Sequence, residues 1–494
     1  MNDLRPLLLT LALISSPALA DAPALTERDA VANLAQHNPT LQAAVLDVRQ
    51  SAEAVRAQNA RYLPTLLLDA TGTTQATPSL NLTTGTTRST SQALVFGAEL
   101  THTFSWGTVV DLRLENTDSQ SQGPAFSGTS DLITLGPGYA LRARLSVTQP
   151  LWRGFGDEVG LADLRAALLN RKESERARDG VAGDALSTLL QAYWELWYSQ
   201  RALDIQRDAR ALAAKQLEGS RKKVLAGSAA ELDSLSYETQ VASLEQSVLG
   251  AEITVRQRAI DLNRAMGRRQ SEEGLDVSAS TPMAIEATDA AQAVAAAQAA
   301  SYSVAQQAIA LELVENSLRS AADATRPRLD VQAWVQTQGL GNQTFAAAAA
   351  QLDTFANVSA NVGLVLELPL SSARHEAQLA QARLAVSAAA ARLEAAKQQV
   401  AADTSSELAT LEQARTNVAL AQRSADVSSR SAEAQRKRYL NGSALAIEVQ
   451  QAEDSLRQAR LSVERERVNA VKAQIRLSNL TGNLLPEWGL QAGR

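Results

Sequence analysis

Side chains that commonly carry catalysis or bind metal ions are few and scattered in this chain of 494 residues. Cysteine is missing, which excludes thiolate zinc sites, cysteine nucleophiles, disulfides and an acylated lipoprotein cysteine. The three histidines, His37, His102 and His375, lie in unrelated segments without metal-ligand spacing. We therefore expect no metal site and no cysteine chemistry.

Motifs for nucleophilic catalysis and nucleotide binding are also missing, since the sequence contains neither G-x-S-x-G nor a P-loop. The pair Gly154-Phe155-Gly156 lacks a third glycine and a βαβ setting, so it indicates a joint between a strand and a helix. A net charge of -6 without a basic tract argues against a nucleic-acid partner. We expect a protein that is not an enzyme and has no cofactor.

The N-terminus is typical of a cleaved export signal. Arg5 precedes the apolar stretch 7–14, and Ala18-Leu19-Ala20 forms a small-residue cleavage site. We expect a signal peptide over residues 1–20, and the alternative is a buried first helix. No later stretch is apolar over the roughly 18 residues that a transmembrane helix needs, so a membrane location would require β-strands.

The remaining sequence repeats one order of parts: helix, strands, long helix, turn and helix. Pro64 and Pro327 stand at corresponding switches from helix to strand, and Pro150 and Pro369 at the switches back. Landmarks that recur in the same order argue for an internal duplication. The predicted segments are a first repeat over 21–266 with strands at about 66–149, a linker over 267–288, a second repeat over 289–482 with strands at about 329–368, and a tail over 483–494.

Heptad patterns predict long coiled-coil helices. Apolar residues from Leu379 to Val400 and from Leu445 to Val463 alternate spacings of three and four, as knobs-into-holes packing requires. The helical pattern over 157–225 would span about 100 Å at 1.5 Å per residue. A structural coiled coil would share this pattern, but it would explain neither the export signal nor the strands.

Alternating patterns predict β-strands with one apolar face. Leu141, Ala143, Leu145 and Val147 alternate with polar residues, and similar runs occur at 110–115 and 358–368. Transmembrane strands of about 9–11 residues show this alternation, with apolar side chains toward lipid. A soluble sandwich with one wet face gives the same alternation. The export signal and the very long helices favour the membrane interpretation.

Several short motifs in this frame resemble the TolC family of outer membrane efflux proteins, and the resemblance covers nearly all of the chain after the signal. The motifs occur in the family's order within the duplicated frame. They are Asn38-Pro39-Thr40-Leu41, Gln149-Pro150-Leu151-Trp152-Arg153-Gly154-Phe155-Gly156, the turns Leu225-Ala226-Gly227-Ser228 and Leu440-Asn441-Gly442-Ser443, and Leu480-Thr481-Gly482.

This resemblance implies an α+β membrane protein that forms a homotrimer in the outer membrane and extends into the periplasm. A long coiled-coil α-helical barrel would continue into a transmembrane antiparallel β-barrel, both shared by the three copies. Such a channel serves a tripartite efflux or type I secretion system, and binds a periplasmic adaptor protein that links it to an inner-membrane pump. A periplasmic adaptor or coiled-coil scaffold is the alternative, although adaptors usually lack the duplication.

The resemblance also assigns roles to the two helical turns. They would dock the adaptor through Leu225, Gly227, Ser228, Leu440, Gly442 and Ser443. Helix capping by glycine is the plainer interpretation, and both can hold. The family's acidic periplasmic aperture would correspond to Asp233, Glu448 and Gln451, where an amide replaces one acid. A ring of three Glu448 side chains would favour cations, while ordinary solvated carboxylates are the alternative.

One part of the chain departs from the family pattern of two strands per half. Residues 94–104 and 108–116 both alternate and flank a turn at Ser105-Trp106-Gly107-Thr108. They form either an extra hairpin that widens the barrel or an excursion outside the membrane. From the family pattern we expect twelve strands in the shared barrel.

Overall fold

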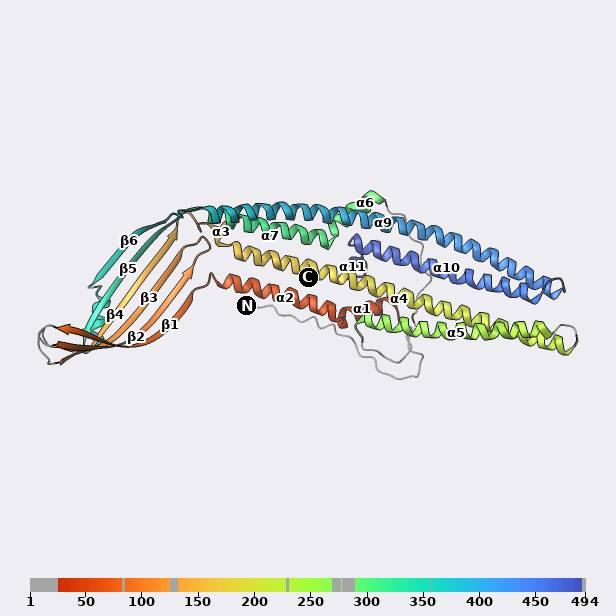
Figure 1. Cartoon of the computed structure of the whole chain (residues 1–494), viewed down its shortest axis with the longest axis horizontal. Helices are drawn as coiled ribbons and strands as arrows, with labels where there is room; N and C mark the ends of the chain where they lie inside the picture. Colours follow the sequence, from red (N-terminus) through yellow and green to blue (C-terminus); the bar gives the residue numbers. More distant parts are fainter. Residues whose placement is uncertain are drawn as a thin grey trace. The chain divides into compact units, whose positions relative to one another are not determined.

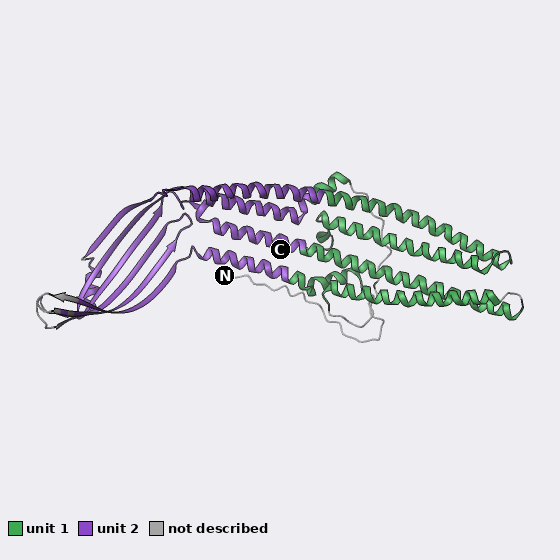
Figure 2. Ribbon diagram, viewed as in Figure 1, with its two compact units in different colours: residues 1–42, 181–297, 402–494 green, residues 43–180, 298–401 purple. Residues whose placement is uncertain are grey.

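The structure is a computed structural model that describes residues 25–81, 85–124, 132–227, 231–268, 277, 289–355 and 357–490. The predicted signal peptide, Ser228, most of the predicted linker and the last four residues lie outside these ranges. The chain divides into two compact units, which Figure 2 shows in different colours. Each unit combines segments of both sequence halves: 1–42, 181–297 and 402–494 in unit 1, and 43–180 and 298–401 in unit 2.

Unit 2 contains one antiparallel sheet of six strands in the order β1-β2-β3-β4-β5-β6 (Figure 1). Every strand therefore pairs with its neighbour in the sequence, which is the simplest route for an antiparallel sheet. The strands are β1 Thr65–Asn81, β2 Gly85–Thr103, β3 Val109–Pro124, β4 Leu132–Pro150, β5 Arg328–Asn342 and β6 Val358–Glu367.

The expectation of two strands in the first half is wrong, because that half supplies four. β2 and β3 form a hairpin inside the sheet. Its turn closes where the Phe104 N–H donates to the Thr108 carbonyl over 2.8 Å, and Gly107 adopts a φ of 96° that favours glycine. Long alternating strands on both sides of a tight turn pair with each other and with their neighbours, so the segment is part of the sheet.

The register gives the sheet one apolar and one polar face. One row of directly paired residues crosses all six strands and is apolar throughout. The row consists of Leu66, Leu100, Leu112, Leu145, Val335 and Ala360, and each of these side chains is exposed in the single chain. The next positions along the strands face the other way and are charged or polar on most strands, with Leu67 on β1 and Trp334 on β5 as exceptions.

A short helix, α8 Phe345–Asp353, lies between β5 and β6 in the sequence and packs against β5. It was not predicted, because the sequence pattern indicated only strands over 329–368. Gly339 and Gly341 make the contact possible: a Cβ on Gly339 would collide with the Ala348 carbonyl oxygen, and one on Gly341 with the Thr344 carbonyl oxygen. These glycines share the face of Val335, so α8 covers part of the apolar face.

Long helices form the rest of the described chain, and their lengths agree with the heptad prediction. α4 has 64 residues and α9 has 68. The remaining helices are shorter. The helices are α1 Glu27–His37, α2 Pro39–Ala60, α3 Asp157–Gly160, α4 Ala162–Leu225, α5 Glu231–Met266, α6 Ala290–Ala300, α7 Tyr302–Ala324, α9 Ala373–Leu440, α10 Ala446–Leu480 and α11 Leu484–Glu487.

Asn38 and Pro39 form the boundary between α1 and α2. The Asn38 side chain accepts hydrogen bonds from the backbone N–H groups of Thr40 and Leu41 at 3.0 and 3.1 Å. Pro39 occupies the first helical position, where its missing N–H costs nothing. The motif Asn38-Pro39 therefore caps α2.

The core of unit 1 lies where α4 meets α1, α5 and α10. Leu186, Leu189 and Tyr193 of α4 are fully buried there, together with Leu34 of α1 and Leu262 of α5. The Tyr193 hydroxyl donates to the Leu25 carbonyl over 2.9 Å, which satisfies the one polar atom of this side chain. Within the described ranges, no helix is both long and apolar enough to cross a membrane.

Candidate functional site

The turn between α9 and α10 has the geometry of a Schellman cap. The Gly442 N–H donates to the Tyr439 carbonyl at 3.0 Å, and the Ser443 N–H donates to the Arg438 carbonyl at 2.9 Å. Gly442 has a φ of 75°, which a β-carbon would disfavour. The predicted capping role is therefore present. Leu440 is 68% exposed.

The turn between α4 and α5 repeats part of this geometry. Gly227 has a φ of 69°, and its N–H donates to the Val224 carbonyl at 2.9 Å. Leu225 is 88% exposed, so both turns present a leucine to solvent. The predicted docking residue Ser228 lies outside the described residues.

The predicted aperture residues lie near the starts of α5 and α10: Asp233 and Glu448 in the first turns, and Gln451 in the second turn of α10. Glu448 and Gln451 lie three residues apart and therefore share one face of α10. Glu448 is half-buried, with one carboxylate oxygen lacking a hydrogen-bond partner in the described part of the chain. Asp233 on α5 is also half-buried, and no described hydrogen bond or ion pair joins it to Glu448.

Sequence reasoning missed the polar side chains that join the first helical hairpin to α10. The Ser236 hydroxyl donates to Gln450 at 2.9 Å, and the Gln240 amide donates to Asp454 at 3.1 Å. Glu453 accepts from Gln216 of α4 at 2.8 Å. The spacing of 450, 453 and 454 is a helical face, which was the available signal.

A buried tyrosine lies beside these links. Tyr237 packs against Leu217 and Ala446. Burial raises the pKa of Tyr237 well above its ordinary value, and the neighbouring Tyr439 adds to the shift. The Lys223 ammonium lies 4.9 Å from the centre of the Tyr439 ring, which is within the range of a cation–π contact. The region beside the two helical turns therefore combines an apolar contact with polar contacts between the helices.

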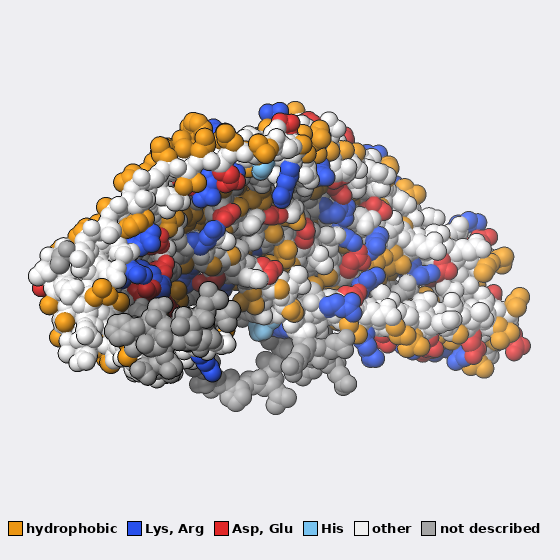
Figure 3. Space-filling model, turned by 60° about the vertical axis from the view of Figure 1, so that its left-hand side comes forward, with side chains coloured by type: hydrophobic (Ala, Val, Ile, Leu, Met, Phe, Trp, Pro, Cys, Tyr) orange, Lys and Arg blue, Asp and Glu red, His pale blue; other side chains and the backbone are white. Residues whose placement is uncertain are grey.

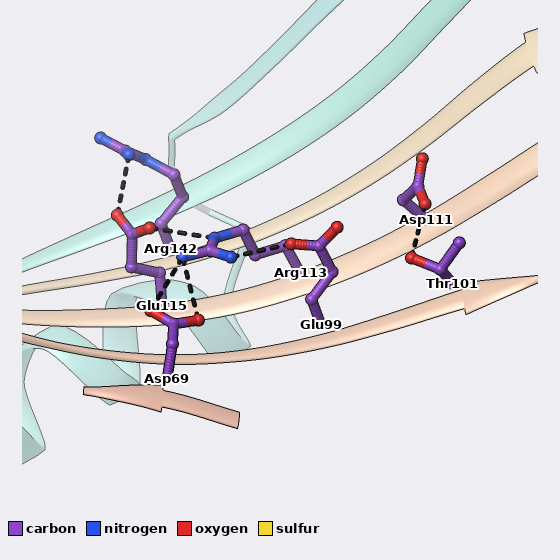
Figure 4. A network of polar contacts seen from close by, with 7 residues as sticks. All are labelled: Asp69, Glu99, Thr101, Asp111, Arg113, Glu115 and Arg142. Carbon is purple, nitrogen blue, oxygen red and sulfur yellow. Dashed lines mark hydrogen bonds and ion pairs between the residues drawn. The ribbon is translucent and has the colours of Figure 1, made fainter. Parts of the chain in front are cut away.

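A second polar cluster lies on the charged face of the sheet (Figure 4). The Arg113 guanidinium contacts three carboxylates on three strands, at 2.8 Å to Glu99, 3.1 Å to Glu115 and 3.3 Å to Asp69. Arg142 of β4 extends the network through a contact of 3.2 Å to Glu115. One guanidinium thus connects β1, β2 and β3, and its planar fork suits several carboxylates at once.

Gly97 provides the space for this network. It pairs directly with Asp69 on one side and Glu115 on the other, and a Cβ there would collide with the Asp69 carboxylate. In Figure 3, blue and red side chains gather on the face of the sheet that is turned forward, and orange side chains follow its margin. The alternation in the sequence predicts on which face of a strand each side chain lies, but it does not predict which side chains meet across the strands.

A further ionic cluster lies in unit 1. Glu195 of α4 contacts Lys472 at 2.7 Å and Arg465 at 2.9 Å, both on α10. Burial alone would raise the pKa of Glu195, but the hydrogen bonds from Lys472 and Arg465 outweigh it and hold that pKa below its ordinary value. The described residues contain no group of three His, Cys, Asp or Glu side chains placed to hold a metal ion.

Comparison with solved structures identifies the fold. CusC shares 16% identity over 92% of both chains with a TM-score of 0.65. The outer membrane protein VceC from Vibrio cholerae shares 14% identity over 92% of this chain and 96% of its own, with a TM-score of 0.65. The outer membrane channel CmeC from Campylobacter jejuni shares 13% identity over 97% and 94%, also with a TM-score of 0.65.

Sequence comparison gives a narrower match. No curated protein matches the chain. Residues 287–483 match the family described as outer membrane efflux protein. The resemblance to the outer membrane efflux proteins of the TolC family is thereby confirmed: the second half carries the family's sequence, and more than nine tenths of the chain shares the fold of outer-membrane channels.

Proposed function

We propose that this protein is the outer-membrane channel of a tripartite efflux or type I secretion system, through which cargo crosses the periplasm and the outer membrane. The observation that carries the proposal is the sheet in which one row is apolar and exposed on all six strands, while the adjacent row is charged on β2, β3 and β4 and polar on β5 and β6. A wall between lipid and a water-filled lumen needs this division. The proposal assigns the protein neither catalysis nor a cofactor.

The edges of the sheet support the proposed homotrimer. In the described chain, β1 pairs only with β2, and β6 pairs only with β5. Unpaired backbone groups are too costly in lipid, so an open sheet must close with other copies. Cyclic association of identical chains closes it without leaving an edge. We assign the long helices to a shared tube that is continuous with this barrel.

We interpret the two sequence halves as an internal duplication, with repeats over 21–266 and 289–482. The helical turns at Gly227 and Gly442 support this interpretation because both combine a positive φ with an exposed leucine. An exported precursor with residues 1–20 removed completes the assignment. We propose that the mature protein lies in the outer membrane, with its helices in the periplasm.

The turns are proposed as docking sites for a periplasmic adaptor, through Leu225, Gly227, Ser228, Leu440, Gly442 and Ser443. Exposed leucines on rigid caps are suitable anchors, because binding them costs little backbone entropy. Asp233, Glu448 and Gln451 are proposed to line the periplasmic aperture. A periplasmic adaptor or scaffold would also use helical hairpins, but it would have no use for six strands with exposed apolar rows.

Reconstitution into planar lipid bilayers tests the proposal. The purified protein should add discrete conductance steps, because a closed polar lumen carries ions. The Glu448→Gln variant should give steps of reduced cation preference if three copies of this side chain face the lumen, whereas Glu53→Gln on α2 should not change the preference. A preparation that binds lipid without any conductance steps would contradict a channel.

A further inference from the structure

The β2–β3 hairpin is fully integrated in the sheet. β2 pairs with β1 from Thr101 to Gly85 without interruption, and β3 pairs with β4 along almost its whole length. A single register shift occurs in β3, between Ser119 and Ser121. Removing the hairpin would leave β1 without a partner and β4 paired only with β5, so the hairpin is an integral part of this sheet.

The same hairpin continues the apolar face. Leu100 on β2 and Leu112 on β3 lie in the exposed row between Leu66 and Leu145. An excursion into water would have no reason to expose leucines in register with the rest of a lipid-facing row. The apolar row therefore indicates that β2 and β3 lie at the same membrane depth as β1 and β4.

The polar face ties the hairpin to both neighbours. Arg113 on β3 reaches Asp69 on β1 at 3.3 Å, across the intervening β2. Arg142 on β4 reaches Glu115 on β3 at 3.2 Å. These contacts hold four consecutive strands as one wall, with the ion pairs on the side that would face the lumen.

The two outer strands are suited to pair with each other between copies. β1 and β6 form the two opposite edges of the sheet. The first residues of β1 and the last residues of β6 lie at the same end of the strands, because Thr65 pairs with Thr101 and Arg328 pairs with Glu367. An even number of strands makes the first and last run in opposite directions, so closure is antiparallel. Both present large apolar side chains on one face, with Leu68 71% and Val362 77% exposed.

We infer that three copies close a barrel of eighteen strands, six from each chain, in which β6 of one copy pairs with β1 of the next. This inference rests on the proposed trimeric channel and replaces the twelve strands expected from the family pattern. Barrel diameter grows roughly linearly with strand number, so this barrel would be about one and a half times as wide. Arg113 and its carboxylates would then line a wide outer-membrane pore.

Engineered disulfides test the inference directly, because the chain has no cysteine of its own. Leu68→Cys on β1 is combined in turn with Ala360→Cys, Val362→Cys and Leu364→Cys on β6, and the outer membranes are oxidised. All four positions lie on the apolar face. At least one pair should give covalent dimers and trimers on a non-reducing denaturing gel, since paired strands bring Cα atoms within disulfide range.

Matched controls use the opposite face and the competing strand order. Leu68→Cys with Ser359→Cys or Asn361→Cys should remain monomeric, because these β6 positions face the lumen. Leu68→Cys with Ala143→Cys should not link within one chain, since three strand spacings of about 4.8 Å separate β1 from β4 by about 14 Å.

Two results overturn the inference while leaving the channel intact. The first is a trimer, verified by its mass in detergent, in which Leu68→Cys and Ala143→Cys link within one chain, as in a twelve-stranded barrel that excludes the hairpin. The second is a trimer in which no β1–β6 pair links between copies. A protein that forms no trimer at all contradicts the proposed function itself.

Discussion

The clearest contributions of individual side chains to this structure are ion pairs between partly buried charged groups. Arg113 is the clearest case, because three carboxylates within 3.3 Å depend on its positive charge. The histidines and the glycine pair, which the sequence singled out first, have no comparable role in the described contacts. Alternation along a strand identifies the polar positions, but only the register between strands shows which of them meet.

Replacing Arg113 should weaken the sheet. Arg113→Met leaves Asp69, Glu99 and Glu115 without their shared cation, and we expect a loss of about 1–3 kcal/mol because these groups are only partly exposed. The temperature at which the assembled protein dissociates on a denaturing gel measures the loss. Arg88→Met, at an exposed position of β2, is the control. Equal effects of both variants would contradict the role of the network.

The ion pairs of Glu195 predict a dependence on pH. Its folded-state pKa lies below the ordinary value of 4.5, so its stabilising contribution is complete above that value and is lost as the pH falls through the lowered pKa. Glu195→Gln should lower the melting temperature at neutral pH and reduce the further loss in acid, as followed by circular dichroism. The exposed variant Glu53→Gln should change neither the melting temperature at neutral pH nor its fall in acid. If the melting temperature of Glu195→Gln falls in acid as much as that of the original protein, the assignment is refuted.

At the scale of elements, the helices were more predictable than the sheet. Heptads, the Asn38-Pro39 cap and the turn glycines identify helices locally, within a few residues. The number of strands could not be read as reliably, because the family pattern of two strands per half outweighed the clear alternation of 94–116. α8 was missed because its alanine-rich sequence lies inside an otherwise strand-like segment, and its position depends on two glycines in β5.

Packing of α8 on β5 provides a test of element placement. Gly339→Val should displace α8, because the new side chain would collide with the Ala348 carbonyl, and overpacking of this kind costs about 1–3 kcal/mol. The yield and heat resistance of the assembled protein should both fall. Gly363→Val in β6 is the matched control, since a Cβ there meets nothing closer than 3.8 Å. Indistinguishable variants would contradict this packing.

The helical turns provide a second test at this scale. Gly227→Leu or Gly442→Leu should abolish export while leaving membrane insertion of the trimer intact, because each change blocks an exposed tip and strains a positive φ. Gly442→Asn tolerates that φ and separates strain from blockage. Gly250→Leu lies in open space on α5, with ordinary helical φ, and serves as the control. Normal export by both tip variants would remove the docking assignment.

At the scale of the whole molecule, the single chain is incomplete. Its sheet has two open edges in the described residues, and apolar side chains are exposed on all six strands. These features are unfavourable for a monomer in water, and the proposed trimer in a membrane would remove both. The predicted export signal, the repeated order of parts and the family motifs led to the channel hypothesis from the sequence, whereas the number of strands depends on pairings that only the structure provides.

Extraction from separated membranes tests the central claim most directly. We predict that the protein sediments with the outer membrane, leaves it only in detergent, and then has the mass of three mature chains, each slightly lighter than the 52.5 kDa of the full sequence, after subtraction of bound detergent. Soluble scaffold proteins of similar length, treated alike, provide the comparison. A monomer recovered in the soluble periplasmic fraction without detergent would contradict the trimeric outer-membrane channel.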